Sequence, residues 1–159
     1  MGSRSETLAS QFEQAVDAFA NAIESCSDAQ WRATCGAEGW TVAATAQHVA
    51  GQFPLEREFI EEAANGGKGL TYTWDDINNK NDRRAADNTS CSKDEVLSLL
   101  REGAANLSAY LRGLSDAQLD RTAPLGLADG ASVSTQQLIE GGVLIDHVKG
   151  HLQSITSAR

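Results

Sequence analysis

The sequence predicts an all-α fold, a four-helix bundle with a long crossover between its second and third helices. Three features favour this class. Aromatic residues make up 6% of the 159 residues while alanine is frequent, a composition typical of closely packed helices. Runs of β-branched residues are short, so no strand pattern competes with the helical one. Several long segments carry the apolar period of amphipathic helices, and the length suits a single domain over residues 1–159.

The first helix is expected at about residues 6–25, where apolar side chains recur with the helical period: Leu8, Phe12, Val16, Phe19 and Ile23. The phrase SDAQ follows it at 27–30 and recurs at 115–118. In each copy the serine and the glutamine can form a capping box, so each copy predicts the start of a short helical turn. Trp31 and Trp40, which follow the first copy, are expected in the core.

The second helix is expected to begin at Thr41, as its N-cap, and to run to about residue 65. Within it His48, Leu55 and Phe59 are spaced by seven and four residues. They therefore share a face, which places the histidine toward the interior. Pro54 should kink or interrupt this helix, because proline removes a backbone donor and clashes with the preceding turn.

A polar segment over residues 70–91, LTYTWDDINNKNDRRAADNTSC, shows no clear period. It predicts an irregular crossover, and long connections of this kind often carry function. The third helix is expected to open at Ser92 in a capping box, SKDE, and to continue to about residue 114. The fourth is expected to open at Ser134, in STQQ, and to run without a break to about Ser157.

The charge balance limits the choice of partners. The net charge of −9 and the pI of about 4.7 disfavour binding to nucleic acid or to an anionic membrane surface. The three cysteines, Cys26, Cys35 and Cys91, indicate neither a disulfide framework nor a thiolate zinc site. No apolar run approaches the roughly 20 residues of a membrane span, and the first residues have no signal-peptide core. A soluble cytoplasmic protein is therefore expected.

Two of the three histidines, His147 and His151, lie four residues apart in the predicted fourth helix. At that spacing the two side chains start about 5–6 Å apart on one face, so both imidazoles can bind one ion. The third, His48, is placed on the inward face of another helix, and bundles build metal sites between facing helices. The sequence therefore predicts a divalent-metal site made by His48, His147 and His151, although any one of them alone is more often a core histidine.

Further residues are candidates for the surroundings of this site. Glu140, seven residues before His147, shares its face of the predicted helix and could act as a general base or support a ligand, or be an exposed charge alone. Trp74, Asp75 and Asn78, in the polar crossover, are candidates to line the open side and bind substrate.

A three-histidine site leaves coordination positions open, which is typical of a catalytic metal. One familiar chemistry is nevertheless disfavoured. In HExxH zinc proteases a glutamate follows the first histidine as the general base, and here that position holds Val148. Peptide hydrolysis by that route is not expected.

The motifs GWTVAATAQHVAG, at 39–51, and DHVKGHLQSI, at 146–155, resemble those of the DinB/YfiT-like superfamily of bacterial metalloproteins. This superfamily includes the N-terminal domain of mycothiol-dependent maleylpyruvate isomerases. The first motif is similar to the family's opening of helix two with a ligand histidine, and the second to its terminal HxxxH helix. The polar crossover and the third helix are similar as well, so the resemblance covers nearly the whole chain.

The resemblance implies a DinB-like bundle in which His48, His147 and His151 hold one divalent ion, zinc or nickel. It further implies a metal-dependent S-transferase or isomerase that uses a low-molecular-weight thiol, such as mycothiol, bacillithiol or glutathione, on a small electrophile. Homodimers are common in the resembling family. In its isomerase branch a carboxylate can replace one histidine of the terminal pair, so His147 is more typical of the all-histidine branch, and no second domain of the isomerase type is expected within these residues.

Two other interpretations stay open. One is a non-catalytic module that sequesters a metal or a small molecule. The other is a helical dimer whose histidines are structural. Metal content separates the second of these from the metalloproteins, and thiol consumption separates the enzyme from the sequestering module.

Overall fold

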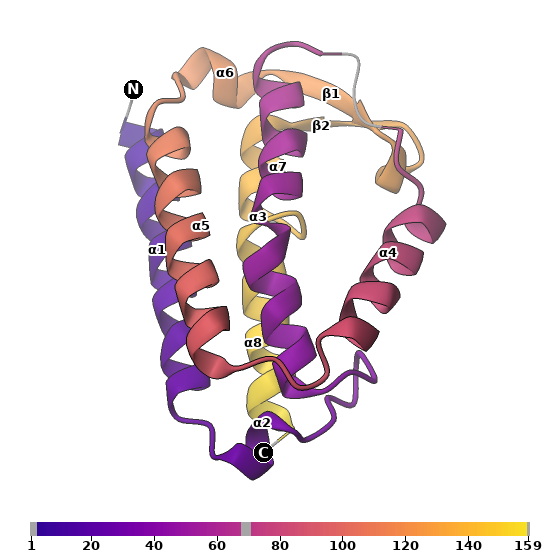
Figure 1. Cartoon of the computed structure of the whole chain (residues 1–159). Helices are drawn as coiled ribbons and strands as arrows, with labels where there is room; N and C mark the ends of the chain where they lie inside the picture. The colour runs from indigo at the N-terminus through magenta and orange to yellow at the C-terminus, as the bar shows by residue number, and fades with distance from the viewer. Residues whose placement is uncertain (1–2, 68–70, 159) are drawn as a thin grey trace.

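The structure, a computed structural model, describes residues 3–67 and 71–158. Its frame is the predicted four-helix bundle, whose long helices run alongside one another in Figure 1. The bundle consists of α1 (Ser3–Glu24), α3 (Val42–Ala64), α5 (Lys93–Arg112) and the successive helices α7 (Thr135–Glu140) and α8 (Ile145–Ser157). Shorter elements connect them: α2 (Asp28–Trp31), α4 (Trp74–Asp87), α6 (Asp116–Asp120), β1 (Thr122–Leu125), the 3-10 turn η1 (Gly126–Ala128) and β2 (Ala131–Ser134).

The core lies between α1, α3, α5 and α8. Its largest fully buried side chains include Phe12, Phe19, Phe53, Ile60, Leu100 and Leu107. The rings of Phe12 and Phe53 meet edge to face with centroids 5.4 Å apart, which joins α1 to α3. Each large apolar side chain that leaves water contributes roughly 1.5–3 kcal/mol. This packing fixes the two helices that carry the histidines, α3 and α8, relative to each other.

Helix starts follow the predicted capping residues closely. Ser27, Ser115 and Ser134 each form a complete capping box with the glutamine three residues later. Thr41 Oγ1 accepts a hydrogen bond from the backbone N–H of Ala44, which fixes the start of α3. These caps satisfy backbone donors that a helix leaves unpaired at its first turn, so short local phrases suffice to set the boundaries.

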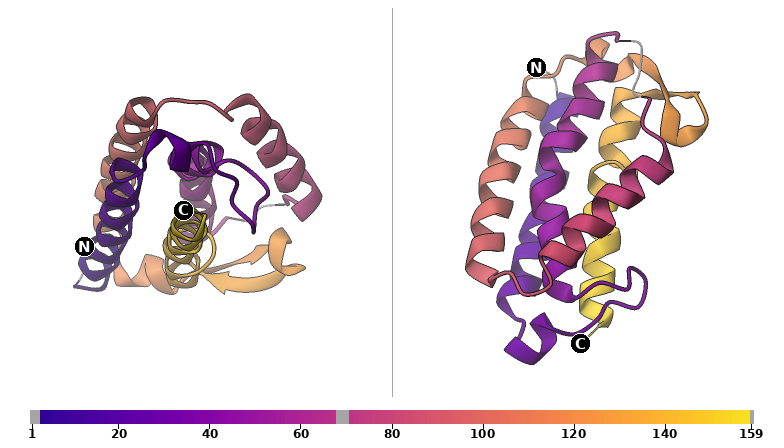
Figure 2. Two further views of the ribbon diagram at one scale, coloured as in Figure 1. Left: turned by 90° about the horizontal axis from the view of Figure 1, so that it is seen from below. Right: turned by 45° about the vertical axis from the view of Figure 1, so that its right-hand side comes forward.

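The predicted irregular crossover is wrong for most of its length, because Trp74–Asp87 forms α4. A capping box between Thr73 and Asp76 starts this helix. Only Ile77 and Ala85 of this helix are buried, so its sequence does not need the repeating apolar side chains from which a helix is predicted. Figure 2 shows α4 set apart from the bundle axis, on the same side as the β1–β2 hairpin.

Three further expectations about the elements are corrected. A small antiparallel hairpin, in which Thr122 pairs with Ser134, precedes the last helix pair although no strand was expected. The last helix is also interrupted: Gly141 adopts an extended conformation after α7, and α8 begins only at Ile145. α3 continues through Pro54, so the helix is not interrupted there as expected. Strands of four residues are too short for their alternating pattern to be recognised in the sequence. The break between α7 and α8 is possible because Gly141 and Gly142 lie there, and glycine is conformationally permissive.

None of the helices within the described ranges, 3–67 and 71–158, combines the length and the apolar character needed to cross a lipid bilayer.

Candidate metal centre

Three imidazoles meet between α3 and α8. Nε2 of His147 lies 3.1 Å from Nε2 of His48 and 3.1 Å from Nε2 of His151. One potential ligand atom from each ring lies within 4.8 Å of the others, and this is the histidine cluster that the sequence predicts. His48 is 3% exposed, and the other two are partly buried. The spacing of four residues brings the terminal pair together as expected, and the bundle brings in His48 across 99 residues of sequence.

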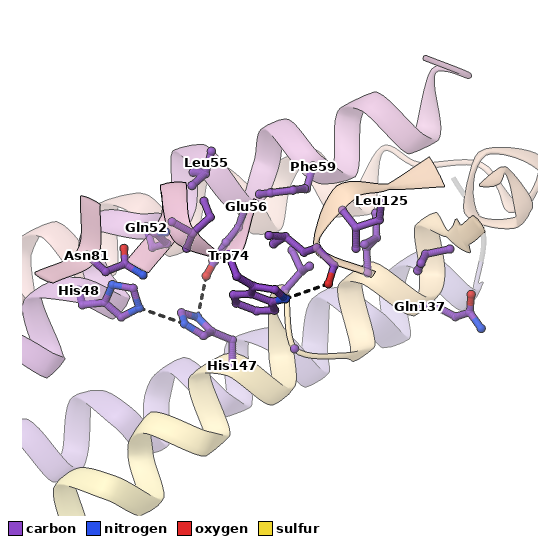
Figure 3. Close-up of a pocket in the computed structure, with 16 residues that line it drawn as sticks. His48, Gln52, Leu55, Glu56, Phe59, Trp74, Asn81, Leu125, Gln137 and His147 are labelled. Carbon is purple, nitrogen blue, oxygen red and sulfur yellow. Dashed lines mark hydrogen bonds and ion pairs between the residues drawn. The ribbon is translucent and has the colours of Figure 1, made fainter. Parts of the chain in front are cut away.

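Carboxylates lie behind two of the rings. Oε1 of Glu38 accepts from Nδ1 of His151 at 2.8 Å. Oε1 of Glu56 lies 2.7 Å from Nδ1 of His147, as seen at the centre of Figure 3. Carboxylates in this position hold the ring orientation and keep the proton on Nδ1, which leaves Nε2 as the free donor atom for a metal.

Neither carboxylate was identified from the sequence. Glu56 follows His48 by eight residues and therefore lies on the same face of α3, a signal that was available. Glu38 lies in the loop before α3, where no periodicity points to the site. Its position depends on a bridge between Thr34 and Thr41 that folds this loop back.

The donor atoms fit a metal ion. In the tautomer that directs each Nδ1 proton at its neighbouring carboxylate, Nε2 of His147 and Nε2 of His151 are both acceptors, and two acceptors at 3.1 Å repel each other. Nδ1 of His48 is buried without a hydrogen-bond partner among the described residues. Nitrogens bound at about 2.0–2.1 Å to one tetrahedral ion lie roughly 3.3 Å apart. A cation between these nitrogens would therefore relieve the repulsion at nearly the observed spacing.

The electrostatics favour neutral rings. Burial, together with the two neighbouring imidazoles and Arg84, lowers the pKa of His48 to about 2. Burial and His147 also lower the pKa of His151, against the opposite effect of Glu38. Neutral imidazole is the form that binds a metal, so these rings need not lose a proton before binding. Burial raises the pKa of Glu56, while the contact with His147 opposes that rise.

Trp31 and Trp40, both expected in the core, differ in burial. Trp31 is buried, and its indole N–H donates to the carbonyl oxygen of Cys91 at 2.7 Å. Trp40 is only half-buried and packs edge-on against His48, with ring centroids 5.3 Å apart. The expectation for Trp40 is therefore wrong, because its indole N–H donates to Asp82 of α4 instead.

A pocket of about 300 Å³ opens beside the cluster. Its walls come from α3, α4, the hairpin region and α7, and both His48 and His147 reach it (Figure 3). Trp74 lines the pocket, as expected of a candidate substrate-binding residue. Asp75 and Asn78 are exposed and are not among the described lining residues. The helical period of α4 brings Ile77 and Asn81 to the pocket instead.

Glu140 lies away from the cluster. It is exposed at the end of α7, where its carboxylate accepts from Gln136 at 2.5 Å. It lines a separate groove between α1 and α8. The seven-residue spacing to His147 predicted a shared face only for a continuous helix, and the break after Gly141 removes that relationship. Glu140 therefore does not act on the cluster in this arrangement.

The helical bundle of this chain is of the DinB/YfiT-like class. The family model described as the mycothiol maleylpyruvate isomerase N-terminal domain matches residues 12–142. The chain therefore belongs to this family. None of the curated proteins matches the sequence significantly.

Solved structures share the fold at low identity. YfiT from Bacillus subtilis, described as a probable metal-dependent hydrolase with an unusual four-helix bundle topology, has a TM-score of 0.79 and 19% identity over 99% of this chain and 87% of its own. An uncharacterized protein from Clostridium difficile 630 has a TM-score of 0.74 and 16% identity, covering 99% of this chain and 96% of its own. The mycothiol-dependent maleylpyruvate isomerase has a TM-score of 0.71 and 15% identity, covering 98% of this chain and 63% of its own.

Proposed function

We propose that His48, His147 and His151 bind one divalent ion, zinc or nickel, in a metal-dependent S-transferase or isomerase. Its reaction joins a low-molecular-weight thiol of the mycothiol, bacillithiol or glutathione kind to a small electrophile, or uses that thiol to isomerise it. The observation that carries the proposal is that Nε2 of His147 lies 3.1 Å from Nε2 of both His48 and His151, so the three rings can share one ion.

A bound divalent ion lowers the pKa of a coordinated thiol or water and polarises a carbonyl oxygen. The residues of this chain prepare the site for that chemistry. Glu38 and Glu56 hold the rings of His151 and His147 with Nε2 directed inward. The pocket beside His48 offers room for a substrate next to the cluster and shields it from water.

The comparisons support the thiol chemistry through the family, whose description names mycothiol and maleylpyruvate isomerisation. They also favour a second candidate, metal-dependent hydrolysis, because YfiT is described as a probable metal-dependent hydrolase. Both reactions need an open coordination position and a substrate pocket, so the same site supports either. The site would also suit a module that sequesters a metal or small molecule without catalysis.

Metal analysis of tag-free protein tests the ligand set. We expect about one zinc or nickel ion per chain, and a loss of metal affinity of at least about 100-fold in His147→Ala and His151→Ala. Gln153→Ala, an exposed position on the same helix, is the matched control and should keep the ion. Failure to bind either metal at that stoichiometry overturns the proposal.

Thiol consumption with a panel of electrophiles tests the reaction. Loss of thiol only in the presence of an electrophile, abolished in His151→Ala, supports S-transfer. Hydrolysis of ester or amide substrates without thiol supports the second candidate instead. Metal binding without either activity supports the sequestering module and overturns the enzyme proposal.

A further inference from the structure

The pocket beside the histidine cluster has two chemically different ends. Near the cluster lie the amide side chains of Gln52 and Asn81, together with Glu56 behind His147 (Figure 3). Apart from Gln137, the rest of the wall is mostly apolar and includes Leu55, Phe59, Leu125, Leu127, Val133 and Leu138. A site divided in this way favours a ligand with one polar group and an apolar body.

We propose that this pocket binds an uncharged electrophile that has a flat apolar body and one carbonyl-type oxygen. The apolar body lies against Trp74 and the aliphatic wall, and the oxygen points toward Gln52 and the histidines. The proposal rests on the proposed function, because it assigns the pocket to the electrophile of that reaction.

Trp74 supplies the surface for a flat ligand. Its side chain is 58% exposed, which is unusual for tryptophan, yet its indole N–H donates to the carbonyl oxygen of Leu127 at 2.9 Å. The first residue of α4 is thereby tied to the turn between the strands, and the ring lies along the pocket in Figure 3. An indole that is both exposed and held in place offers a ready face for stacking.

Gln52 supplies a donor for the polar group. It is 7% exposed, and its Oε1 accepts from Arg84 at 3.4 Å. Because arginine can only donate, this contact fixes which end of the amide faces Arg84. The amide nitrogen of Gln52 lies at the other end of the amide, and Gln52 lines the pocket. Its N–H groups can therefore donate to an acceptor oxygen on the ligand.

The side chains that line the metal-free pocket do not attract anions. Among the described lining residues there is no lysine or arginine, and the one carboxylate is that of Glu56. A carboxylate ligand would lose its hydration beside apolar side chains without gaining a cation from them. A thiol carrying sugar or peptide groups would likewise leave its polar groups unpaired, and at about 300 Å³ the pocket is small. The electrophile therefore suits this pocket better than the thiol does.

A matched ligand pair tests the charge preference. Benzylideneacetone and cinnamate share a phenyl ring and a conjugated carbon–carbon double bond, but only cinnamate is charged. In calorimetry with metal-free protein, which excludes coordination of the carboxylate, benzylideneacetone should bind at least about tenfold more tightly. Equal binding, or tighter binding of cinnamate, overturns the proposal.

A variant pair tests the role of Trp74. Trp74→Ala should weaken benzylideneacetone binding about tenfold. Leu99→Ala is the matched control, because Leu99 is also an exposed large apolar side chain, on α5, and does not line the pocket. Unchanged binding in Trp74→Ala overturns the proposal. A further outcome is that zinc-loaded protein consumes no thiol although benzylideneacetone still binds more tightly than cinnamate and Trp74→Ala still weakens its binding. In that case the proposed function fails and the assignment of the pocket stands.

Discussion

Glu38 and His151 are 113 residues apart in the sequence, yet the carboxylate of Glu38 accepts a hydrogen bond from the ring of His151 at 2.8 Å. The loop that carries Glu38 precedes α3, so this contact connects the entrance of one site helix to the middle of the other. It orients a ring that also packs against the imidazoles of His48 and His147.

Replacement of this carboxylate should weaken metal binding without removing it. We expect Glu38→Gln to lower zinc affinity by about 10–100-fold, because the ring loses a charged acceptor that raises its basicity. Competition with a chromogenic chelator measures the change. Glu58→Gln, at an exposed position of α3, should behave as wild type. Equal affinities for the two variants would show that Glu38 does not support the ligand.

Glu56 should increase zinc affinity while it lowers the stability of the metal-free protein. It is 4% exposed, and burial raises the pKa of its carboxyl group. Glu56→Gln keeps an acceptor beside His147 but removes the buried charge, so metal-free protein should gain about 1 kcal/mol in unfolding free energy at pH 7. Zinc affinity should fall at the same time. Urea unfolding in a chelator and a zinc titration measure the two effects, and a stability loss in the metal-free variant would contradict this account.

Acid should weaken the contact between α1 and α5. Arg112 binds both carboxylate oxygens of Glu13, and with Ser108 it lowers the pKa of Glu13 to about 2. The folded state thus binds the proton less tightly than the unfolded chain, whose pKa is near 4.5. This stabilisation is present above pH 4.5 and is lost as the pH falls toward 2.

Glu13→Gln should therefore lower the unfolding free energy at pH 7 by only roughly 0.5 kcal/mol, because the side chain is 43% exposed. The difference from wild type should shrink below pH 4.5 and disappear near pH 2. Urea unfolding at several pH values measures it, and a difference that grows in acid would contradict the assignment.

Two helical glycines should respond to alanine with opposite signs. A Cβ at Gly103 of α5 would lie 2.9 Å from Cδ2 of Phe53, a ring with 2% exposure that Phe12 also contacts. Gly103→Ala should therefore destabilise by about 1–3 kcal/mol in spite of better helix propensity. A Cβ at Gly150 of α8 would meet nothing within 4 Å. Gly150→Ala should stabilise by up to about 1 kcal/mol and leave zinc binding unchanged. Thermal unfolding of the two variants decides the signs.

The histidine cluster could be predicted because its signals are local. The spacing of His147 and His151 fixes their shared face, and the apolar residues around His48 fix its inward direction. Glu38 could not be found in this way, since its position depends on the path of a loop. Nothing in the residues around it records which distant helix it will meet.

The crossover and the last helix show that the apolar period alone did not predict these two segments correctly. α4 buries only Ile77 and Ala85, so its helix is defined by its cap at Thr73 and by contacts with the bundle. Apolar period, the strongest signal in sequence, is absent there. In the last helix the period continues across the glycines at 141 and 142, and it therefore concealed the break that sets Glu140 apart from His147.

α4 also separates folding stability from ligand preference, two demands that usually compete at a binding site. Since nearly all of its side chains lie outside the core, substitutions along it cost little folding stability, yet its first turns form one wall of the cavity. Selection, natural or in the laboratory, can therefore redraw ligand preference on this one segment while the bundle that holds the imidazoles stays unchanged. Such a division would allow related proteins to diverge in substrate and still share one scaffold.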